Sequence, residues 1–419
     1  IRSTGNDAWA LQLRNSQAKL GTKDSEVRCE LLNLDALIQA GPQMQLEAQL
    51  DARIKSRLRK QQLPEVKLAS DYRGSMQDGT FSLSLDDTAE SMSLSLQGKL
   101  DLQSGRGQYS LNASSQDLPY AASSVLPILQ KLGVMQDSVT VTSGTLSLES
   151  AVTSATFAID SWRQQSQLAI QNLSGSFADY RFDGITMNAD WKGIEQWQTV
   201  RPVEFSMAAL DVGFDVVDVK ARVALPTPSP PAQPVVRIEQ FSAGMFGGRV
   251  FLPAARSWDF AAATNQLTLR AEQWRLADMV ALQQGQNIQA VGTLEGELPV
   301  TVTAGRIIID NGYLRALAPG GNIRYVADDA ARALAASSPE LGLAMDLLSD
   351  FQYEVLSSEV KLDKEGNLLL GLSLAGKNPE QYEGRPINFN INLEQNLDPL
   401  LQSLRLSDKL VEGIEGRLQ

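Results

Sequence analysis

Alternation of apolar and polar residues with a period of two is the feature that most limits what this chain can fold into. In residues 91–103, SMSLSLQGKLDLQ, apolar side chains stand at Met92, Leu94, Leu96, Leu100 and Leu102, while Ser, Gln, Lys and Asp take the odd positions. Successive side chains of a β-strand point to opposite faces of its sheet, so this spacing predicts a strand with one apolar face. Something must cover that face in water.

The same alternation recurs through the first half of the chain, in residues 80–85, 109–113, 139–150, 185–191, 203–207 and 217–225. The parity of the pattern changes at Gly144, which predicts a β-bulge there. Residues 44–58 fit both a strand and a helical stripe with apolar residues four apart. We interpret them as a strand because Met44, Ala48 and Ala52 complete a period-two set with the leucines.

Helices are predicted at only a few places. Residues 119–133 and 276–285 carry apolar stripes, and each ends on a glycine. Ser338 is a suitable N-cap with Pro339 in the first helical position, which predicts a helix start. Asp398 and Pro399 repeat this arrangement, and residues 398–419 are predicted to form a terminal amphipathic helix.

A proline-rich segment gives the clearest break in the chain. Proline cannot donate to a sheet ladder, so LPTPSPPAQP in residues 225–234 ends a sheet edge or links two units. We therefore expect an amino-terminal β part in residues 1–225, a linker or edge break in 226–234, and a carboxy-terminal β part with helical insertions in 235–397. The terminal helix follows.

Composition excludes several classes of function. The formal net charge of −12 disfavours nucleic acid as a partner. There is no histidine and Cys29 is the only cysteine, so the usual general base, a Ser-His-Asp triad and a cysteine zinc site are missing. The acidic pairs Asp86-Asp87 and Asp328-Asp329 are typical of turns and helix caps. We predict no enzyme, no catalytic residues, no cofactor and no metal.

Many strands with one apolar face and few helices leave three physical solutions. Two sheets can pack on each other, a barrel can face lipid, or a sheet can curve around a cavity. A lipid-facing barrel should carry aromatic girdles, and an aromatic content of 6% in scattered positions argues against it. The pattern alone does not choose between a closed β-sandwich and an open groove.

Three stretches in roughly the last 180 residues resemble a known family. They are FSAGMFGGRVFLPAAR (241–256), VGTLEGELPVTVTAGRIIIDNGYLRALAPGGNIRY (291–325) and LAGKNPEQYEGRPINFNINLEQNLDPLLQSLRLSDKL (374–410). They are similar to the carboxy-terminal half of the YdbH-type proteins, within the AsmA-like superfamily of Gram-negative envelopes. The likeness is a diffuse signature without a catalytic motif.

The resemblance implies a fold and a function. It implies a mainly β chain, an elongated curved antiparallel sheet or β-groove with an apolar concave face and a few capping helices. It also implies periplasmic phospholipid transport between the inner and outer membranes, with an inner-membrane anchor upstream of this segment. The implied partners are phospholipid and a small outer-membrane lipoprotein that adds β-strands at the carboxy-terminal end. The alternative is a structural adaptor of closed β-sandwich units that binds a lipoprotein and no lipid.

These expectations assign residues to two sites. The residues expected to line the groove are Leu83, Leu85, Met92, Leu94, Leu96, Leu100, Leu102, Leu111, Val139, Val141, Leu368, Leu370, Leu372 and Leu374. The residues expected to bind the partner are Ile387, Phe389, Ile391 and Leu393. For each of them, ordinary packing in a protein core is the alternative interpretation.

Overall fold

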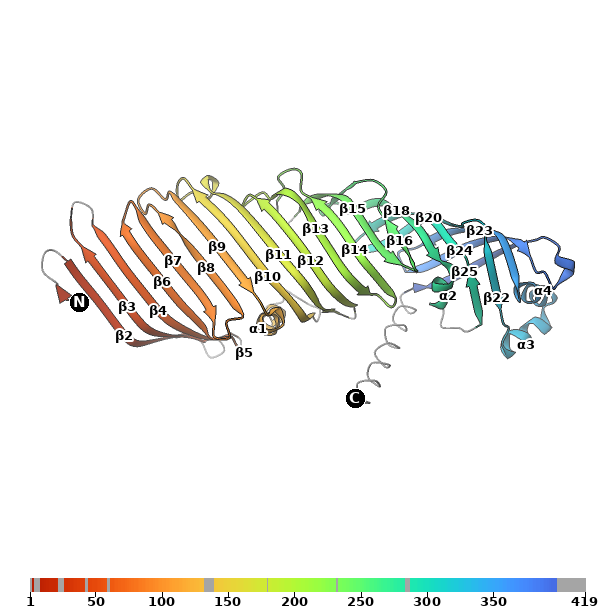
Figure 1. Ribbon diagram of the computed structural model, residues 1–419, viewed down its shortest axis with the longest axis horizontal. Coiled ribbons are helices and arrows are strands. Elements are labelled where there is room, and N and C mark those ends of the chain that lie inside the picture. The colour runs from red at the N-terminus through yellow and green to blue at the C-terminus, as the bar shows by residue number, and fades with distance from the viewer. Residues whose placement is uncertain are drawn as a thin grey trace. The chain divides into compact units, whose positions relative to one another are not determined.

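The computed structural model is mainly β, with few short helices, and its strand pairs are antiparallel (Figure 1). It describes residues 2–3, 8–21, 26–41, 44–58, 61–131, 139–178, 180–230, 233–282 and 287–397. The predicted fold class is confirmed in these respects, while the apolar concave face stays a prediction. The predicted terminal helix, residues 398–419, lies outside the described residues.

The chain divides into two compact units. Unit 1 comprises residues 1–207 and 224–232, and unit 2 comprises residues 208–223 and 233–419. Strands β13 (Gln198–Asp211) and β14 (Asp215–Ala224) are divided between the units. The linker expected in residues 226–234 stays a prediction. Within unit 1, its residue Ser229 forms a β-bridge with Trp197.

Unit 1 is an antiparallel meander. Its elements are β1 (Arg2–Ser3), β2 (Ala8–Gly21), β3 (Glu26–Gln39), β4 (Gln45–Leu58), β5 (Gln61–Gln62), β6 (Val66–Ser75), β7 (Gly79–Asp87), β8 (Met92–Leu100), β9 (Gly107–Ser115), α1 (Leu118–Lys131), β10 (Val139–Ser154), η1 (Ile159–Ser161), β11 (Arg163–Phe177) and β12 (Tyr180–Lys192). From β2 to β12, each strand except the short β5 pairs with the next one along the chain. Strong period-two patterns joined by short connections favour this topology.

The strand ends of unit 1 form two rims. The α1 rim holds the β4–β6 and β7–β8 connections, helix α1 and the β11–β12 turn, and the η1 rim holds the β3–β4, β6–β7, β8–β9, β10–β11 and β12–β13 connections. Figure 1 shows the η1 rim above and the α1 rim below. Helix α1 packs on β10 and confirms the helix predicted at 119–133 as far as Lys131; residues 132–133 lie outside the described residues.

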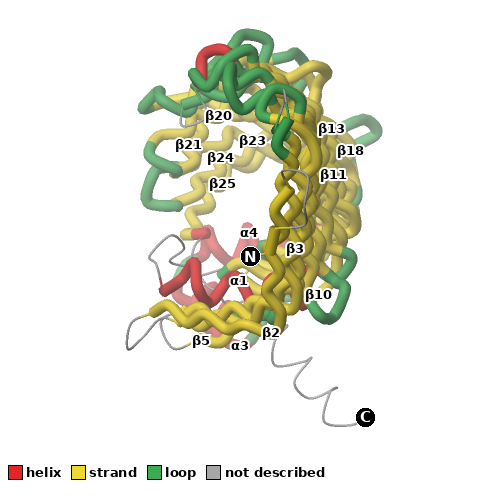
Figure 2. The backbone as a smooth tube through the Cα atoms, turned by 90° about the vertical axis from the view of Figure 1, so that its left-hand side faces the viewer, coloured by secondary structure: helices red, strands yellow, loops and turns green. Residues whose placement is uncertain are grey.

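Bulges bend the long strands of unit 1. The β10–β11 register shifts on both sides of Ser143, next to Gly144 with its φ of 131°, so the predicted bulge is confirmed. A second shift lies between Leu31 and Asn33, where β3 pairs with β4. An extra residue in one strand bends it and increases its twist. Figure 2 shows the strands nearest the viewer, β2 and β3, bending along their length.

Unit 2 contains shorter strands and most of the helices. Its elements are β15 (Val235–Met245), β16 (Gly248–Phe251), β17 (Arg256–Asp259), β18 (Thr264–Arg275), α2 (Leu276–Ala281), β19 (Ile288–Val291), β20 (Thr293–Thr303), β21 (Arg306–Ala316), β22 (Gly321–Tyr325), α3 (Asp329–Ser337), α4 (Pro339–Leu348), β23 (Phe351–Leu362), β24 (Asn367–Lys377), η2 (Tyr382–Gly384) and β25 (Ile387–Asn396). Strand β23 pairs with β21, with β22 and with β24, and β24 pairs with β25. Helix α4 packs against β22 and α3 packs against α4.

Unit 2 has a packed core. Phe351 is fully buried and its ring meets that of Phe389 edge-on, with the centroids 5.2 Å apart. The buried Tyr353 donates a hydrogen bond from its hydroxyl to the carbonyl oxygen of Val291, at 2.9 Å. Burial raises the pKa of this phenol to about 12. Phe351 and Tyr353 lie at the start of β23, where β22 and β24 flank this strand.

The caps of helices α3 and α4 are formed by residues that the sequence predicts as caps. The Ser338 side chain accepts a hydrogen bond from the Leu341 amide, as predicted for the start of α4. Asp328 caps α3 by accepting from the Ala331 amide, so the helix-cap interpretation of this aspartate is confirmed. The buried Asn378 donates to the carbonyl oxygens of Asp346 and Leu347, which ties the end of α4 to the end of β24.

Candidate functional site

Strand register in unit 1 gathers apolar side chains from distant parts of the chain onto one face. Residues directly opposite each other in an antiparallel pair lie on the same face of the sheet. Followed from β2 to β12, one row of partners is Leu13, Leu34, Leu50, Ser70, Leu83, Leu96, Leu111, Ser150, Ser166 and Trp191. From β3 to β12, a second row is Leu31, Ala52, Leu68, Leu85, Leu94, Ala113, Leu148, Leu168 and Ala189. We call the face that carries these rows the apolar face.

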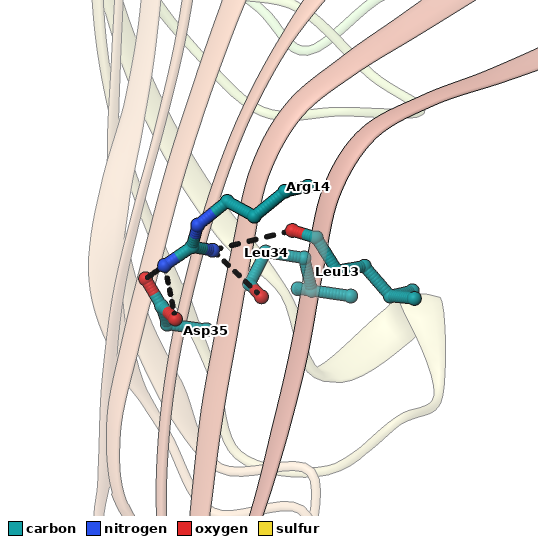
Figure 3. Close-up of polar contacts among 4 residues, drawn as sticks. All are labelled: Leu13, Arg14, Leu34 and Asp35. Carbon is teal, nitrogen blue, oxygen red and sulfur yellow. Dashed lines mark hydrogen bonds and ion pairs between the residues drawn. The ribbon is translucent and has the colours of Figure 1, made fainter. Parts of the chain in front are cut away.

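The row between these two belongs to the opposite, polar face. Its members are Asn33, Asp51, Ala69, Ser84, Ser95, Asn112, Glu149, Gln167 and Asp190. The Arg14 guanidinium donates to both carboxylate oxygens of Asp35, at 2.7 and 2.9 Å, and to the carbonyl oxygens of Leu13 and Leu34 (Figure 3). The hydrogen bond from Arg14 holds the pKa of Asp35 below its usual value. Charged and polar side chains therefore make up most of this face.

No second layer covers the apolar face among the described residues of unit 1. Elements in contact there are sheet neighbours, together with α1 on β10. In the described part of unit 1, the buried hydrophobic residues are Ala52, Met207 and Ala224, and the leucines of the two rows are half-buried or exposed. In unit 2, by contrast, Leu294 is 2% exposed. Among the described residues, the same alternating pattern therefore belongs to a packed core in unit 2 and to a face without a second layer within unit 1.

The apolar face is large. Ten strands run from β2 to β12 when the two-residue β5 is left out, and their spacing of about 4.8 Å gives a span of roughly 43 Å. Six residue steps, as from Tyr109 to Ser115 in β9, add a height of roughly 20 Å. The sheet area spanned is roughly 900 Å², serine positions included, and the largest apolar patches on typical soluble monomers cover a few hundred Å².

The structure brings together most of the predicted lining residues of the first half. Leu83, Leu96 and Leu111 lie in the first row, and Leu85 and Leu94 lie in the second. Met92 and Leu100 share their face on β8, because they stand an even number of residues from Leu94 and Leu96.

The other predicted lining residues of unit 1 lie outside these rows. Val139 and Val141 lie in β10, beyond the bulge at Gly144. Leu102 lies in the β8–β9 turn and is 37% exposed. Lipid contact at each of these positions stays a prediction.

The predicted residues of the second half lie in unit 2. Leu368, Leu370, Leu372 and Leu374 alternate along β24, and Leu374, at 3% exposed, is buried. The predicted partner-binding residues lie on the neighbouring strand, where Phe389 opposes Leu374, Ile391 opposes Leu372 and Leu393 opposes Leu370; Ile387 opposes Gly376. Among the described residues β25 pairs with β24 alone, so its other side is a sheet edge.

Several residues of the apolar face were not predicted as lining. Strands β2, β3, β4, β6, β11 and β12 contribute Leu13, Leu34, Leu50, Leu68, Leu168 and Met187, among others. The sequence feature that could have identified these residues is the same period-two alternation. In β4 this alternation coincides with a helical spacing of apolar residues. The interpretation of this segment as a strand is confirmed.

Asp87 ends β7 at the α1 rim and fixes the turn into β8. This buried carboxylate accepts hydrogen bonds from the amides of Ser91 and Met92, both at 2.8 Å, and from the Ser91 hydroxyl at 2.9 Å. Burial raises the pKa of Asp87, but the hydrogen bonds from Met92 and Ser91 outweigh burial and leave the pKa below its usual value of 3.8.

This arrangement predicts a pH-dependent stability. A lowered folded-state pKa means that the contribution of Asp87 is complete well above pH 3.8 and disappears as the pH falls through the folded-state pKa. We expect Asp87→Asn to lower the free energy of unfolding by about 1.5–3 kcal/mol at pH 7, and by much less near pH 2. Urea unfolding across this range tests it, with Asp86→Asn as the control; an equal loss at both pH values would contradict the assignment.

The described residues contain no group of three or more His, Cys, Asp or Glu side chains placed to hold a metal ion. None of their helices has the length and apolar character needed to cross a membrane.

The geometry defines a class of protein, a mainly β chain with a broad apolar sheet face that has no second layer over it among the described residues of unit 1. Comparison with protein families gives the particular family. Residues 2–419 match the YdbH-like family, described as intermembrane phospholipid transport protein YdbH, and the chain belongs to this family. The resemblance of the last 180 residues is thereby confirmed and extends over the first half as well. No significant match was found among curated proteins or solved structures.

Proposed function

We propose that the apolar face of unit 1 carries the acyl chains of phospholipids during transport between the inner and outer membranes, in the periplasm. The observation that supports this proposal most strongly is the uncovered face of roughly 900 Å² in a chain of the YdbH-like family. Membership of the family points to phospholipid as the cargo. The uncovered face is a surface on which acyl chains can lie.

The energetics favour such a surface over free diffusion. A two-chain lipid exposes on the order of thirty methylenes in water, which at about 0.8 kcal/mol each amounts to roughly 24 kcal/mol. An apolar sheet face removes much of this barrier while the headgroup stays in solvent. The task requires an uninterrupted apolar surface and no chemical step. Leucines at alternate positions also avoid deep, specific wells in which a lipid would stall.

The experiment is lipid analysis of the purified full-length chain. We expect mass spectrometry of an organic extract, taken from protein purified without detergent, to find about one or more phospholipid molecules per chain. A chain free of phospholipid when purified without detergent would support the adaptor alternative instead.

We further propose that the small outer-membrane lipoprotein docks along the outer edge of β25. An unpaired strand edge accepts another strand through backbone hydrogen bonds, with side-chain pockets giving specificity. Ile387, Phe389 and Ile391 are half-buried, and Leu393 is exposed. The added strand would extend the same sheet.

Paired proline substitutions test this docking. Successive N–H groups of a strand point to opposite edges, so one of Ile391→Pro and Asn392→Pro removes an outward N–H and the other removes a bond to β24. The variant that keeps the wild-type unfolding midpoint is the informative one. We expect it to lose lipoprotein co-purification at least tenfold, and retained binding in that variant would count against docking at β25.

A further inference from the structure

Tryptophan residues that look scattered in the sequence gather at one rim of unit 1. Four of the six tryptophans belong to this unit, and all four lie at the η1 rim. Trp9 is the second residue of β2, Trp162 precedes β11, Trp191 stands one residue before the end of β12, and Trp197 follows in the β12–β13 connection. The α1 rim has rings of its own at Phe177, Tyr180 and Phe182, but no tryptophan among the described residues.

Three of these tryptophans lie on the apolar face. Trp191 opposes Ser166 in the first row, and Trp9 opposes Ile38 and alternates with Leu11 and Leu13. Trp162 stacks on Tyr109, with ring centroids 5.7 Å apart and planes at 18°. Tyr109 itself belongs to the apolar face, because it opposes Gly98 of β8, two residues from Leu96.

Two tyrosines on the same side point their hydroxyls toward this rim. The Tyr72 hydroxyl donates to the carbonyl oxygen of Ser75, the last residue of β6, at 2.9 Å. The Tyr109 hydroxyl lies 3.3 Å from the Ser154 hydroxyl at the end of β10. The Tyr109 ring lies along the sheet over Gly107, where a Cβ would come within 2.1 Å of the phenol oxygen. Each ring thus covers sheet surface with its apolar body and places its polar tip at the rim.

Two of the tryptophans also carry unused donors. The indole Nε1 atoms of Trp162 and Trp191 are buried and have no hydrogen-bond partner among the described residues. Buried donors are nearly always satisfied, and an acceptor on a bound ligand would satisfy these two. Next to them, the Gln164 amide donates to the Ser166 hydroxyl at 2.7 Å, and Ser166 donates to Ser150 at 2.8 Å. These hydroxyl groups place polar atoms on the apolar face near the η1 rim.

We propose that the η1 rim binds the glycerol-ester region and headgroup of a phospholipid, while its acyl chains extend over the leucine rows toward the α1 rim. This inference rests on the proposed function and adds an orientation to it. Tyrosine and tryptophan rings lie where the apolar interior of a bilayer meets its headgroups, because they combine an apolar body with a polar tip. The indole N–H groups would donate to ester or phosphate oxygens.

The dimensions of the face agree with this orientation. From Tyr109 to Ser115, β9 rises roughly 20 Å from the η1 rim to the α1 rim. One leaflet contributes about half of the roughly 30 Å hydrocarbon core of a bilayer, so an acyl chain needs roughly 15 Å. An acyl chain laid along the strands therefore fits between the two rims.

Photoreactive lipids test the orientation on the full-length chain. Vesicles of phosphatidylethanolamine would carry a diazirine either on the headgroup amine or at the end of one acyl chain, and cross-linked peptides would be mapped by mass spectrometry. We expect the headgroup probe to label residues 76–81, 101–109 and 155–163 several-fold more than residues 85–94. The chain-end probe should show the reverse preference. Equal or inverted preferences would overturn the orientation, whereas a failure of both probes to label unit 1 would contradict the proposed function itself.

A single substitution tests what the indole of Trp162 contributes to headgroup binding. Trp162→Leu keeps an apolar side chain but removes the ring and the N–H donor. We expect headgroup-probe labelling of residues 155–163 and 101–109 to fall by about threefold or more, with chain-end labelling of residues 85–94 unchanged. Trp258→Leu, in β17 of unit 2, is the matched control and should leave both patterns unchanged. If Trp162→Leu behaves like this control, the indole has no part in binding the headgroup end.

Discussion

Replacing Leu96 by aspartate is expected to remove most of the phospholipid that purifies with this chain. Leu96 lies in the first apolar row between Leu83 and Leu111, so its side chain faces any acyl chain on the sheet. An unpaired carboxylate against hydrocarbon is unfavourable by several kcal/mol, and each 1.4 kcal/mol corresponds to a factor of ten. We therefore expect bound phospholipid, measured by mass spectrometry, to fall at least tenfold.

The chain offers a matched control one residue away. Gln97 is exposed and faces the polar side of the sheet, so Gln97→Asp adds the same charge to the same strand. This control should keep wild-type lipid content, and both variants should keep the wild-type circular dichroism. Equal lipid loss in the two variants, or none in either, would contradict the assignment of the apolar face.

Truncating Leu294 to alanine should destabilise the protein far more than truncating Leu96. Leu294 is 2% exposed in β20, opposite Trp274 and Ala316, so its loss leaves a cavity in a packed core. Core Leu→Ala changes lower the free energy of unfolding by about 2–5 kcal/mol. Leu96 is half-buried in a single layer, and we expect Leu96→Ala to lower it by about 1 kcal/mol or less.

Hydrogen exchange can make this comparison within each unit separately. Exchange rates along β20 should rise strongly in Leu294→Ala, while those along β8 should change little in Leu96→Ala. If Leu96→Ala proves as damaging as Leu294→Ala, its side chain is packed under a second layer, and no uncovered face exists.

Much of the fold can be predicted from local pattern. Period-two alternation identified the strands of unit 1, the parity change at Gly144 identified a bulge, and Ser338 with Pro339 identified the start of α4. These features depend on a few neighbouring residues, and the backbone responds to them locally. Residues 276–285 were predicted as one helix; α2 covers Leu276–Ala281, and residues 283–285 lie outside the described residues.

Coverage of an apolar face cannot be predicted from such local patterns. The alternating leucines of β8 and β24 look alike, yet Leu374 is buried and Leu96 is not. The difference arises from what packs above each sheet, which depends on contacts between segments far apart in the chain. The gathering of Trp9, Trp162 and Trp191 at one rim is likewise a result of strand register across the whole of unit 1.

The most direct test of the account places a photoreactive amino acid at each of residues 93–97 in turn, in living cells. Because β8 presents alternate side chains to opposite faces, phospholipid should be captured from positions 94 and 96 and not from positions 93, 95 and 97. Capture without this alternation, or no capture at any of the five positions, would contradict the claim that the uncovered face of unit 1 carries lipid.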